Sequence, residues 1–167
     1  MDLEFEDEFI ERFKGVQRLV ILGVGNIIRR DDGVGPRIIH SLKGKLNGRV
    51  KLIDTGPIPE SFTDVIKAFK PTHILIIDAA GMNKKPGCIR FIEEDQILNT
   101  SFSTHQMPLS LLIDYLKCET DSKIYLLGIQ PLTNAFGEGL TPEVEEAKQR
   151  IVKLLIKIFK KNCEGAG

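Results

Sequence analysis

Residues 19–22 form a continuous apolar run, Leu-Val-Ile-Leu, that ends in the sequence Gly23-Val24-Gly25-Asn26. A strand that is buried on both faces, as in a parallel sheet, has this uninterrupted apolar pattern. Glycines directly after such a strand allow the backbone to turn sharply. We therefore expect a buried strand at about 18–23 that opens into a loop at its carboxyl end. Ligand sites of open α/β sheets lie at that edge.

Strand and helix patterns alternate along the rest of the chain. The segment 73–78 is the most hydrophobic and is expected to be the central strand, whereas 88–92 follows a short connection and could be an edge hairpin. Apolar residues at helical spacing, followed by turn residues, mark the helices. The expected strands are 18–23, 50–53, 73–78, 88–92 and 123–128, and the expected helices follow the apolar patterns of 34–46, 62–69, 109–116 and 141–158. This order predicts a three-layer α/β sandwich, with a mostly parallel, twisted sheet of about five strands and helices on both faces.

The length and composition suit a single domain spanning residues 1–167. Residues 1–15 form an N-terminal extension, in which 3–13 are either a short amphipathic helix packed on the domain or a loose segment, and 162–167 are expected to be a flexible tail. The 23 basic and 23 acidic residues balance, which argues against a broad nucleic-acid surface. No apolar run approaches the roughly 20 residues of a membrane span, and the acidic N-terminus is unlike a signal peptide. We expect a cytoplasmic, monomeric protein without membrane insertion.

Polar side chains follow several of the predicted strands. Asp31 and Asp32 follow the first strand, Asp54 and Asp78 end the second and third, and His105 precedes a helix. Two carboxylates with one imidazole would suit a borderline divalent transition metal. Three protein ligands leave coordination positions open for water or substrate, as in catalytic metal sites. The sequence therefore places a candidate metal-dependent site at the carboxyl edge of the sheet.

Each of these residues also has a structural interpretation. Asp31 or Asp32 could cap the following helix, and Asp54 could close a turn with Gly56. The pair Arg29-Arg30 fits either a solvated surface or a contact to a substrate carboxylate. The candidate site therefore depends on several weak signals that converge on one edge.

Other chemistries find less support. The dinucleotide fingerprint G-x-G-x-x-G lacks its third glycine, because Ile28 stands at that position after Gly23 and Gly25. No Walker loop, G-x-S-x-G elbow or H-E-x-x-H motif is present. A non-catalytic metal-binding or nucleotide-binding module with the same sheet remains the alternative to an enzyme.

Taken together in their order, the motifs resemble the [NiFe]-hydrogenase maturation endopeptidases. The resemblance runs from about residue 18 to residue 155, and its late segments, 126–131 and 136–143, are most similar to the HycI-like branch that processes hydrogenase-3-type large subunits. Each motif is weak alone, but the ordered set is specific. The matching motifs are Gly23-Val24-Gly25-Asn26, Asp31-Asp32-Gly33-Val34-Gly35, Asp54-Thr55-Gly56, Ile76-Ile77-Asp78-Ala79 and Ser103-Thr104-His105-Gln106.

The resemblance implies an aspartic-type endopeptidase that removes the C-terminal extension of a hydrogenase large-subunit precursor after nickel insertion. It implies that Asp32, Asp78 and His105 contact the nickel of the precursor, with Asp32 and Asp78 as the catalytic residues. No cofactor is then bound permanently, because nickel or a substitute divalent metal is contacted only in the substrate complex. Further substrate contacts are expected from the strand-end loops, at Gly25, Asn26, Asp31, Asp54, Thr55 and Gly56.

Overall fold

The computed structural model describes residues 3–97 and 108–161, and within them five strands form one sheet. The order across the sheet is β2-β1-β3-β5-β4, so the strongly apolar β3 is central, as predicted. Four strands are parallel, and only β4 runs antiparallel, against β5. The strands are β1 (Leu19–Val24), β2 (Val50–Gly56), β3 (His73–Ala79), β4 (Ile89–Ile92) and β5 (Lys123–Ile129).

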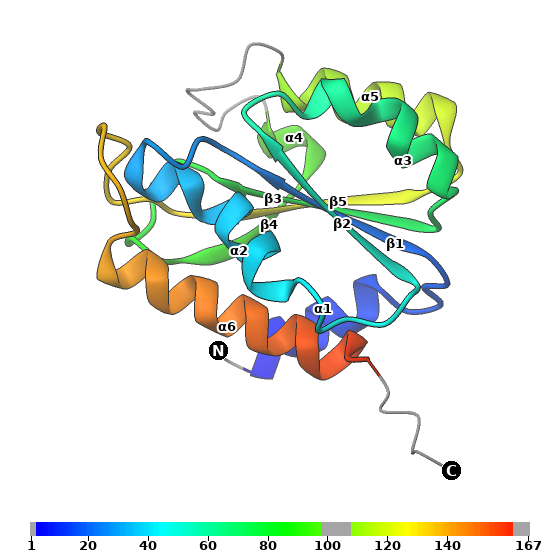
Figure 1. Ribbon diagram of the computed structural model, residues 1–167, viewed down its shortest axis with the longest axis horizontal. Coiled ribbons are helices and arrows are strands. Elements are labelled where there is room, and N and C mark those ends of the chain that lie inside the picture. The colour runs from blue at the N-terminus through cyan, green and yellow to red at the C-terminus, as the bar shows by residue number, and fades with distance from the viewer. Residues whose placement is uncertain (1–2, 98–107, 162–167) are drawn as a thin grey trace.

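Helices cover both faces of this sheet (Figure 1). One face carries α1 (Leu3–Arg12), α2 (Val34–Leu42) and α6 (Pro142–Phe159). The other carries α3 (Thr63–Phe69), the short α4 (Glu94–Ile97) and α5 (Leu109–Glu119). Two 3₁₀ turns, η1 (Arg30–Gly33) and η2 (Pro59–Phe62), precede α2 and α3. The predicted α/β sandwich is therefore confirmed.

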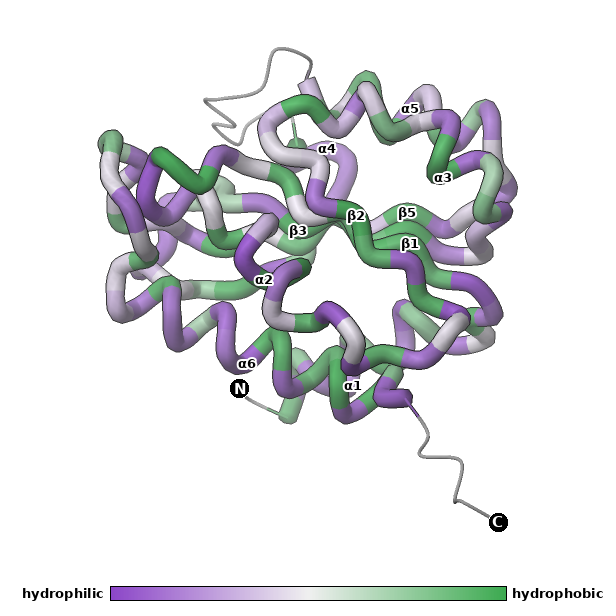
Figure 2. The backbone as a smooth tube through the Cα atoms, viewed as in Figure 1, coloured by the Kyte–Doolittle hydropathy of each residue, from purple (hydrophilic) through white to green (hydrophobic). Residues whose placement is uncertain are grey.

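The strands of the sheet divide their side chains between two cores. Successive side chains of a strand point to opposite faces. In β1, Leu19 and Ile21 join the core under α1, α2 and α6, whereas Val20 and Leu22 join the core under α3 and α5. Figure 2 shows the resulting pattern, with hydrophobic strands at the centre and hydrophilic stretches on the outer helices.

Two local predictions differ from the structure. The strand at 88–92 lies at the edge, but it does not form a hairpin with the preceding strand, because β3 is already paired with β1 and β5. The predicted helix along 34–46 ends at Leu42, since Gly44 adopts a left-handed backbone with φ 75°. Among the described residues, no helix combines the length and apolar character needed to cross a bilayer.

Most of the N-terminal extension, Leu3–Arg12, is helix α1, which packs on the domain. Phe5, Phe9 and Phe13 of this segment are buried, and the ring centroids of Phe9 and Phe13 lie 4.6 Å apart. Phe5 stacks on Phe91 of β4 at 5.7 Å. The packed alternative for residues 3–13 is therefore correct. The predicted tail at 162–167 lies outside the described residues.

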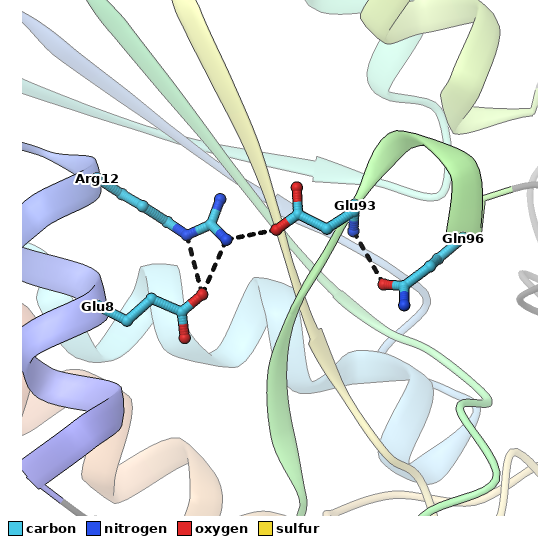
Figure 3. Close-up of polar contacts among 4 residues, drawn as sticks. All are labelled: Glu8, Arg12, Glu93 and Gln96. Atoms are coloured by element: carbon cyan, nitrogen blue, oxygen red, sulfur yellow. Dashed lines mark hydrogen bonds and ion pairs between the residues drawn. The ribbon is translucent and has the colours of Figure 1, made fainter.

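A polar contact holds the same helix from its exposed side (Figure 3). The guanidinium of Arg12 donates to Glu8 of α1 at 2.8 Å and pairs with Glu93, which follows β4. The amide of Glu93 in turn donates to the side-chain oxygen of Gln96 at 3.2 Å. Helix α1 is thus joined to the edge of the sheet by both apolar and polar contacts.

Candidate active site

The loop after β1 is held in one conformation by its own side chains. Gly25 has φ 138°, and a Cβ there would meet the Asp32 carbonyl oxygen at 1.8 Å, so only glycine fits. The Asn26 side chain accepts a hydrogen bond from the Ile28 amide at 3.1 Å. The Asn26 amide donates to Oδ2 of Asp32 at 2.9 Å. The sequence Gly25-Asn26 therefore positions the carboxylate of Asp32.

Asp31 is fully buried and accepts hydrogen bonds from a loop more than 100 positions further along the chain. Its Oδ2 accepts from the amides of Leu132 at 2.9 Å and Thr133 at 3.2 Å. Its Oδ1 accepts from the amide of Thr141 at 2.8 Å, and the Thr141 hydroxyl contacts both oxygens, at 3.0 and 2.8 Å. Burial of a carboxylate is tolerated when hydrogen bonds satisfy its oxygens. Asp31 thus joins the β1–α2 and β5–α6 loops, and its carboxylate faces protein donors.

Neither acid occupies the N-cap position of the next helix. The residue before α2 is Gly33, and no side chain provides a cap hydrogen bond there. The 3₁₀ turn η1 intervenes, and Arg30 within it adopts a left-handed backbone with φ 45°. Non-glycine residues in this conformation store strain and cluster at functional sites. The N-cap position of α2 is therefore Gly33 rather than Asp31 or Asp32.

Asp78 is the second-last residue of the central strand and is completely buried. It reaches the same edge as Asp32 because α2 begins between the ends of β1 and β3. A Cβ on Gly35 would lie 2.5 Å from the Val24 carbonyl oxygen and 2.6 Å from that of Ile77. Asp78 follows Ile77 directly, and Asp32 lies three positions before Gly35. The close packing of α2 at this glycine therefore brings the loop of Asp32 next to the strand end that carries Asp78.

The last residues of β2 contact the neighbouring β1–α2 loop and α2. Oδ1 of Asp54 accepts from the Gly56 amide at 2.9 Å, which is the predicted turn, and Oδ2 lies 3.1 Å from Nε2 of His40 on α2. The Thr55 hydroxyl donates to the Gly23 carbonyl at 3.2 Å, and the Gly25 amide donates to the Gly56 carbonyl at 3.0 Å. These contacts align β2 with the loop that carries Asp32.

His105, the third predicted metal ligand, falls at 98–107, outside the described residues. Among the residues that the structure does describe, no three His, Cys, Asp or Glu side chains are grouped so that they could hold a metal. Asp32 and Asp78 supply carboxylate oxygens at one edge. Such oxygens can ligate a divalent metal, accept a proton from water, or do both in one reaction cycle.

The sequence interpretation missed the contribution of the β5–α6 loop. Thr141 does precede α6, as predicted, but its hydroxyl donates to Asp31 and makes no cap hydrogen bond. Arg29 stacks its guanidinium 4.0 Å from the ring centroid of Phe136 in the same loop. The helix was expected to begin at residue 141, but no local signal identified a partner of Thr141 that lies 110 positions away.

Comparison with known proteins gives a consistent result. A family model described as "Hydrogenase maturation protease" (HycI) matches residues 36–158. A putative hydrogenase maturation protease of Methanocaldococcus jannaschii is 40% identical over 162 residues, covering 92% of this chain and 95% of that protein. The hydrogenase 3 maturation protease of Escherichia coli K12 is 37% identical over 137 residues, which cover 81% of this chain and 87% of that protein. The crystal structure of a [NiFe] hydrogenase maturation protease HycI from Thermococcus kodakarensis superposes with a TM-score of 0.83 at 31% identity. The superposition covers 90% of this chain and 97% of that chain.

Proposed function

Because this chain belongs to the HycI family of hydrogenase maturation proteases and is therefore a peptide-bond hydrolase, we propose that it removes a C-terminal extension from a [NiFe]-hydrogenase large-subunit precursor. The cleavage follows nickel insertion, and the enzyme recognises the precursor through that nickel. The precursor is its protein partner, and the metal belongs to the substrate rather than to a resident cofactor.

One observation carries the proposal: two acids at the carboxyl edge, Asp32 and Asp78, lie on elements that pack together at Gly35. Both carboxylates are almost or fully buried, with Asp32 6% and Asp78 0% exposed. A buried carboxylate strongly prefers a positive partner. A divalent cation presented by the substrate is such a partner, and the aspartate oxygens then complete its coordination.

The hydrolysis needs a nucleophilic water and a group that accepts its proton. One of the two carboxylates, Asp32 or Asp78, accepts this proton as the water attacks the scissile carbonyl. The carboxylic acid so formed then returns the proton to the departing amine. The nickel orients the substrate and polarises the water or the carbonyl. His105 serves as the third ligand of the nickel, and the strand-end turns at Gly25-Asn26 and Asp54-Thr55-Gly56 hold the site.

Recognition through nickel explains how an enzyme of this kind would ignore an unfinished precursor. The ligands bind only if the precursor presents an ion that still has open coordination positions. A nickel-free precursor lacks that ion, so its scissile bond is not held at the carboxylates. Selectivity then results from binding the metal, without any further discrimination between the two forms of the polypeptide.

The test is incubation of the protein with nickel-loaded and with nickel-free precursor, followed by intact-mass analysis. We expect a C-terminal peptide to be released from the nickel-loaded form alone. Equal cleavage of both forms would remove nickel recognition from the proposal, and cleavage of neither would remove the proposed substrate. Family membership favours this enzyme over the non-catalytic alternative, which would instead bind metal or nucleotide in calorimetry without releasing a peptide.

A further inference from the structure

Two loops beside the candidate active site expose large apolar side chains. Ile27 and Ile28 of the β1–α2 loop are 49% and 53% exposed, and Leu132 and Phe136 of the β5–α6 loop are 56% and 70% exposed. Figure 2 shows the corresponding hydrophobic stretches in both loops, at the left of the view. Together with Arg29 we call this surface the loop platform. Single exposed apolar residues are ordinary, but a group of four around one site indicates an interaction surface.

The platform is preorganised by contacts between the two loops. The Arg29 guanidinium lies 4.0 Å from the ring centroid of Phe136. The Gly137 amide donates to the Ile28 carbonyl at 2.9 Å, and the Arg30 amide donates to the Gly137 carbonyl at 3.1 Å. A surface fixed before binding loses less conformational entropy when a partner docks. The exposed ring and guanidinium are therefore held ready for a partner.

The charge of Arg29 is also available. Within residues 3–97 and 108–161, no carboxylate forms an ion pair with Arg29, and its one side-chain hydrogen bond is a long contact of 3.5 Å to the Asn134 carbonyl. Glu138, an exposed acid of the same loop, is not paired with it. Stacking on an aromatic ring leaves the in-plane N–H groups of a guanidinium open to a carboxylate. The platform thus combines an apolar surface with an unpaired positive charge.

The position of the platform identifies its occupant. The Asn26 amide, directly before Ile27 in the chain, donates to Oδ2 of Asp32 at 2.9 Å, so the platform begins beside this carboxylate. The Leu132 amide donates to the carboxylate of Asp31, the neighbour of Asp32 in the chain, at 2.9 Å, which places the second loop beside the first. A protein substrate held at the carboxylates is therefore in reach of both loops.

We propose that the loop platform is the docking surface for the large-subunit precursor. An apolar side chain of the precursor packs on Phe136 and Leu132, and a carboxylate of the precursor pairs with Arg29. This inference rests on the proposed function for the identity of the partner. It assigns binding to Phe136 and Arg29, separately from the chemistry at Asp32 and Asp78.

The experiment measures cleavage of nickel-loaded precursor by the full chain carrying Phe136→Ala, Arg29→Gln or Arg29→Lys. We expect KM to rise about tenfold for Phe136→Ala and Arg29→Gln while kcat stays within about twofold, because uniform binding is lost. Arg29→Lys keeps the charge and is expected to recover part of the affinity. The matched control is Ile10→Ala, since Ile10 is 50% exposed on α1, outside both loops.

The outcomes separate the two proposals. If the wild type cleaves the precursor and KM is unchanged in Phe136→Ala and Arg29→Gln, the loop platform is not the docking surface, but the proposed function stays intact. If the wild type does not cleave the precursor, the proposed function fails. The docking proposal is then tested by comparing the affinity of the wild type and of the same variants for the precursor. Sedimentation analysis tests whether a second copy of this chain occupies the loop platform instead. A wild-type dimer that dissociates in Phe136→Ala would show an interface between copies of this chain and would overturn the proposal.

Discussion

Oδ1 of Asp31 accepts a hydrogen bond from the Thr141 amide at 2.8 Å, and its Oδ2 accepts one from the Thr141 hydroxyl at the same distance. All partners of this carboxylate that we describe are donors. We predict that Asp31→Asn destabilises the protein by about 2–4 kcal/mol, because an amide NH₂ would then face N–H and O–H groups. Chemical denaturation measures this. Thr141→Ser, which keeps the hydroxyl, is the control, and a loss below about 0.5 kcal/mol in Asp31→Asn would contradict the account.

The packing at Gly35 leads to a second prediction. A Cβ at this position would approach two carbonyl oxygens within 2.6 Å, so the start of α2 must move away from β1 and β3. Overpacking of this kind costs about 1–3 kcal/mol, and here it also displaces the loop of Asp32. Gly35→Ala is therefore expected to lower both the midpoint of thermal unfolding and the rate of cleavage. Gly48→Ala, where nothing lies within 4 Å of the added carbon, should leave both unchanged.

Helix α1 is expected to be an integral part of the fold. Phe9 is completely buried, with Phe13 at 4.6 Å and Phe91 at 5.8 Å between ring centroids. Phe9→Ala should cost about 3–5 kcal/mol in the free energy of unfolding. The neighbouring Ile10 is half exposed, so Ile10→Ala should stay within about 0.5 kcal/mol of the wild type. If Phe9→Ala also lowered the free energy of unfolding by no more than about 0.5 kcal/mol, α1 would not be part of the core.

His73 makes stability depend on pH. Burial, together with the nearby charge of Lys123, lowers the pKa of His73 below its ordinary value of 6.5. The unfolded chain therefore takes up the proton at a higher pH than the folded protein does. The contribution of His73 is complete above the ordinary pKa and is lost as the pH falls from there toward the lowered pKa of the folded state.

This linkage is measurable against a variant that cannot titrate at the position. The free energy of unfolding of the wild type minus that of His73→Gln should decrease between about pH 7.5 and about pH 5. Acidic residues titrate equally in both proteins at these pH values and cancel in the difference. A difference that stays constant, or that increases as the pH falls, would contradict the inferred direction of the pKa shift.

Sequence patterns were sufficient for the fold because the strands are buried on both faces and the helices on one. The apolar run at 73–78 predicted a central strand, and β3 is the middle of the sheet. The pairing of β4 with β5 was not predictable, since the sequence of a four-residue strand does not indicate which other strand has an unpaired edge. The end of α2 was missed because the apolar spacing continues past Gly44 to Leu46, although the backbone turns there.

The candidate site was predictable only in part. The rule that ligand sites form at the carboxyl ends of parallel strands predicted that Asp32 and Asp78 share one edge of the sheet, and the structure places both at that edge. The same rule could not show that the environment of Asp31 differs from that of Asp32 and Asp78. The carboxylate of Asp31 is surrounded by donors of the distant β5–α6 loop. Such long-range contacts depend on the folded arrangement of two loops, and neighbouring residues in the chain do not specify them.

Cleavage of nickel-loaded precursor by Asp78→Asn tests the central claim most directly. The exchange keeps the shape of a side chain at the end of β3 but removes its charge and its capacity as a base. Asp64→Asn is the matched control, because the Asp64 side chain is 96% exposed on α3. With unchanged circular dichroism in both variants, we predict at least a roughly 100-fold lower rate for Asp78→Asn and a wild-type rate for Asp64→Asn. A wild-type rate in a folded Asp78→Asn protein would contradict the account.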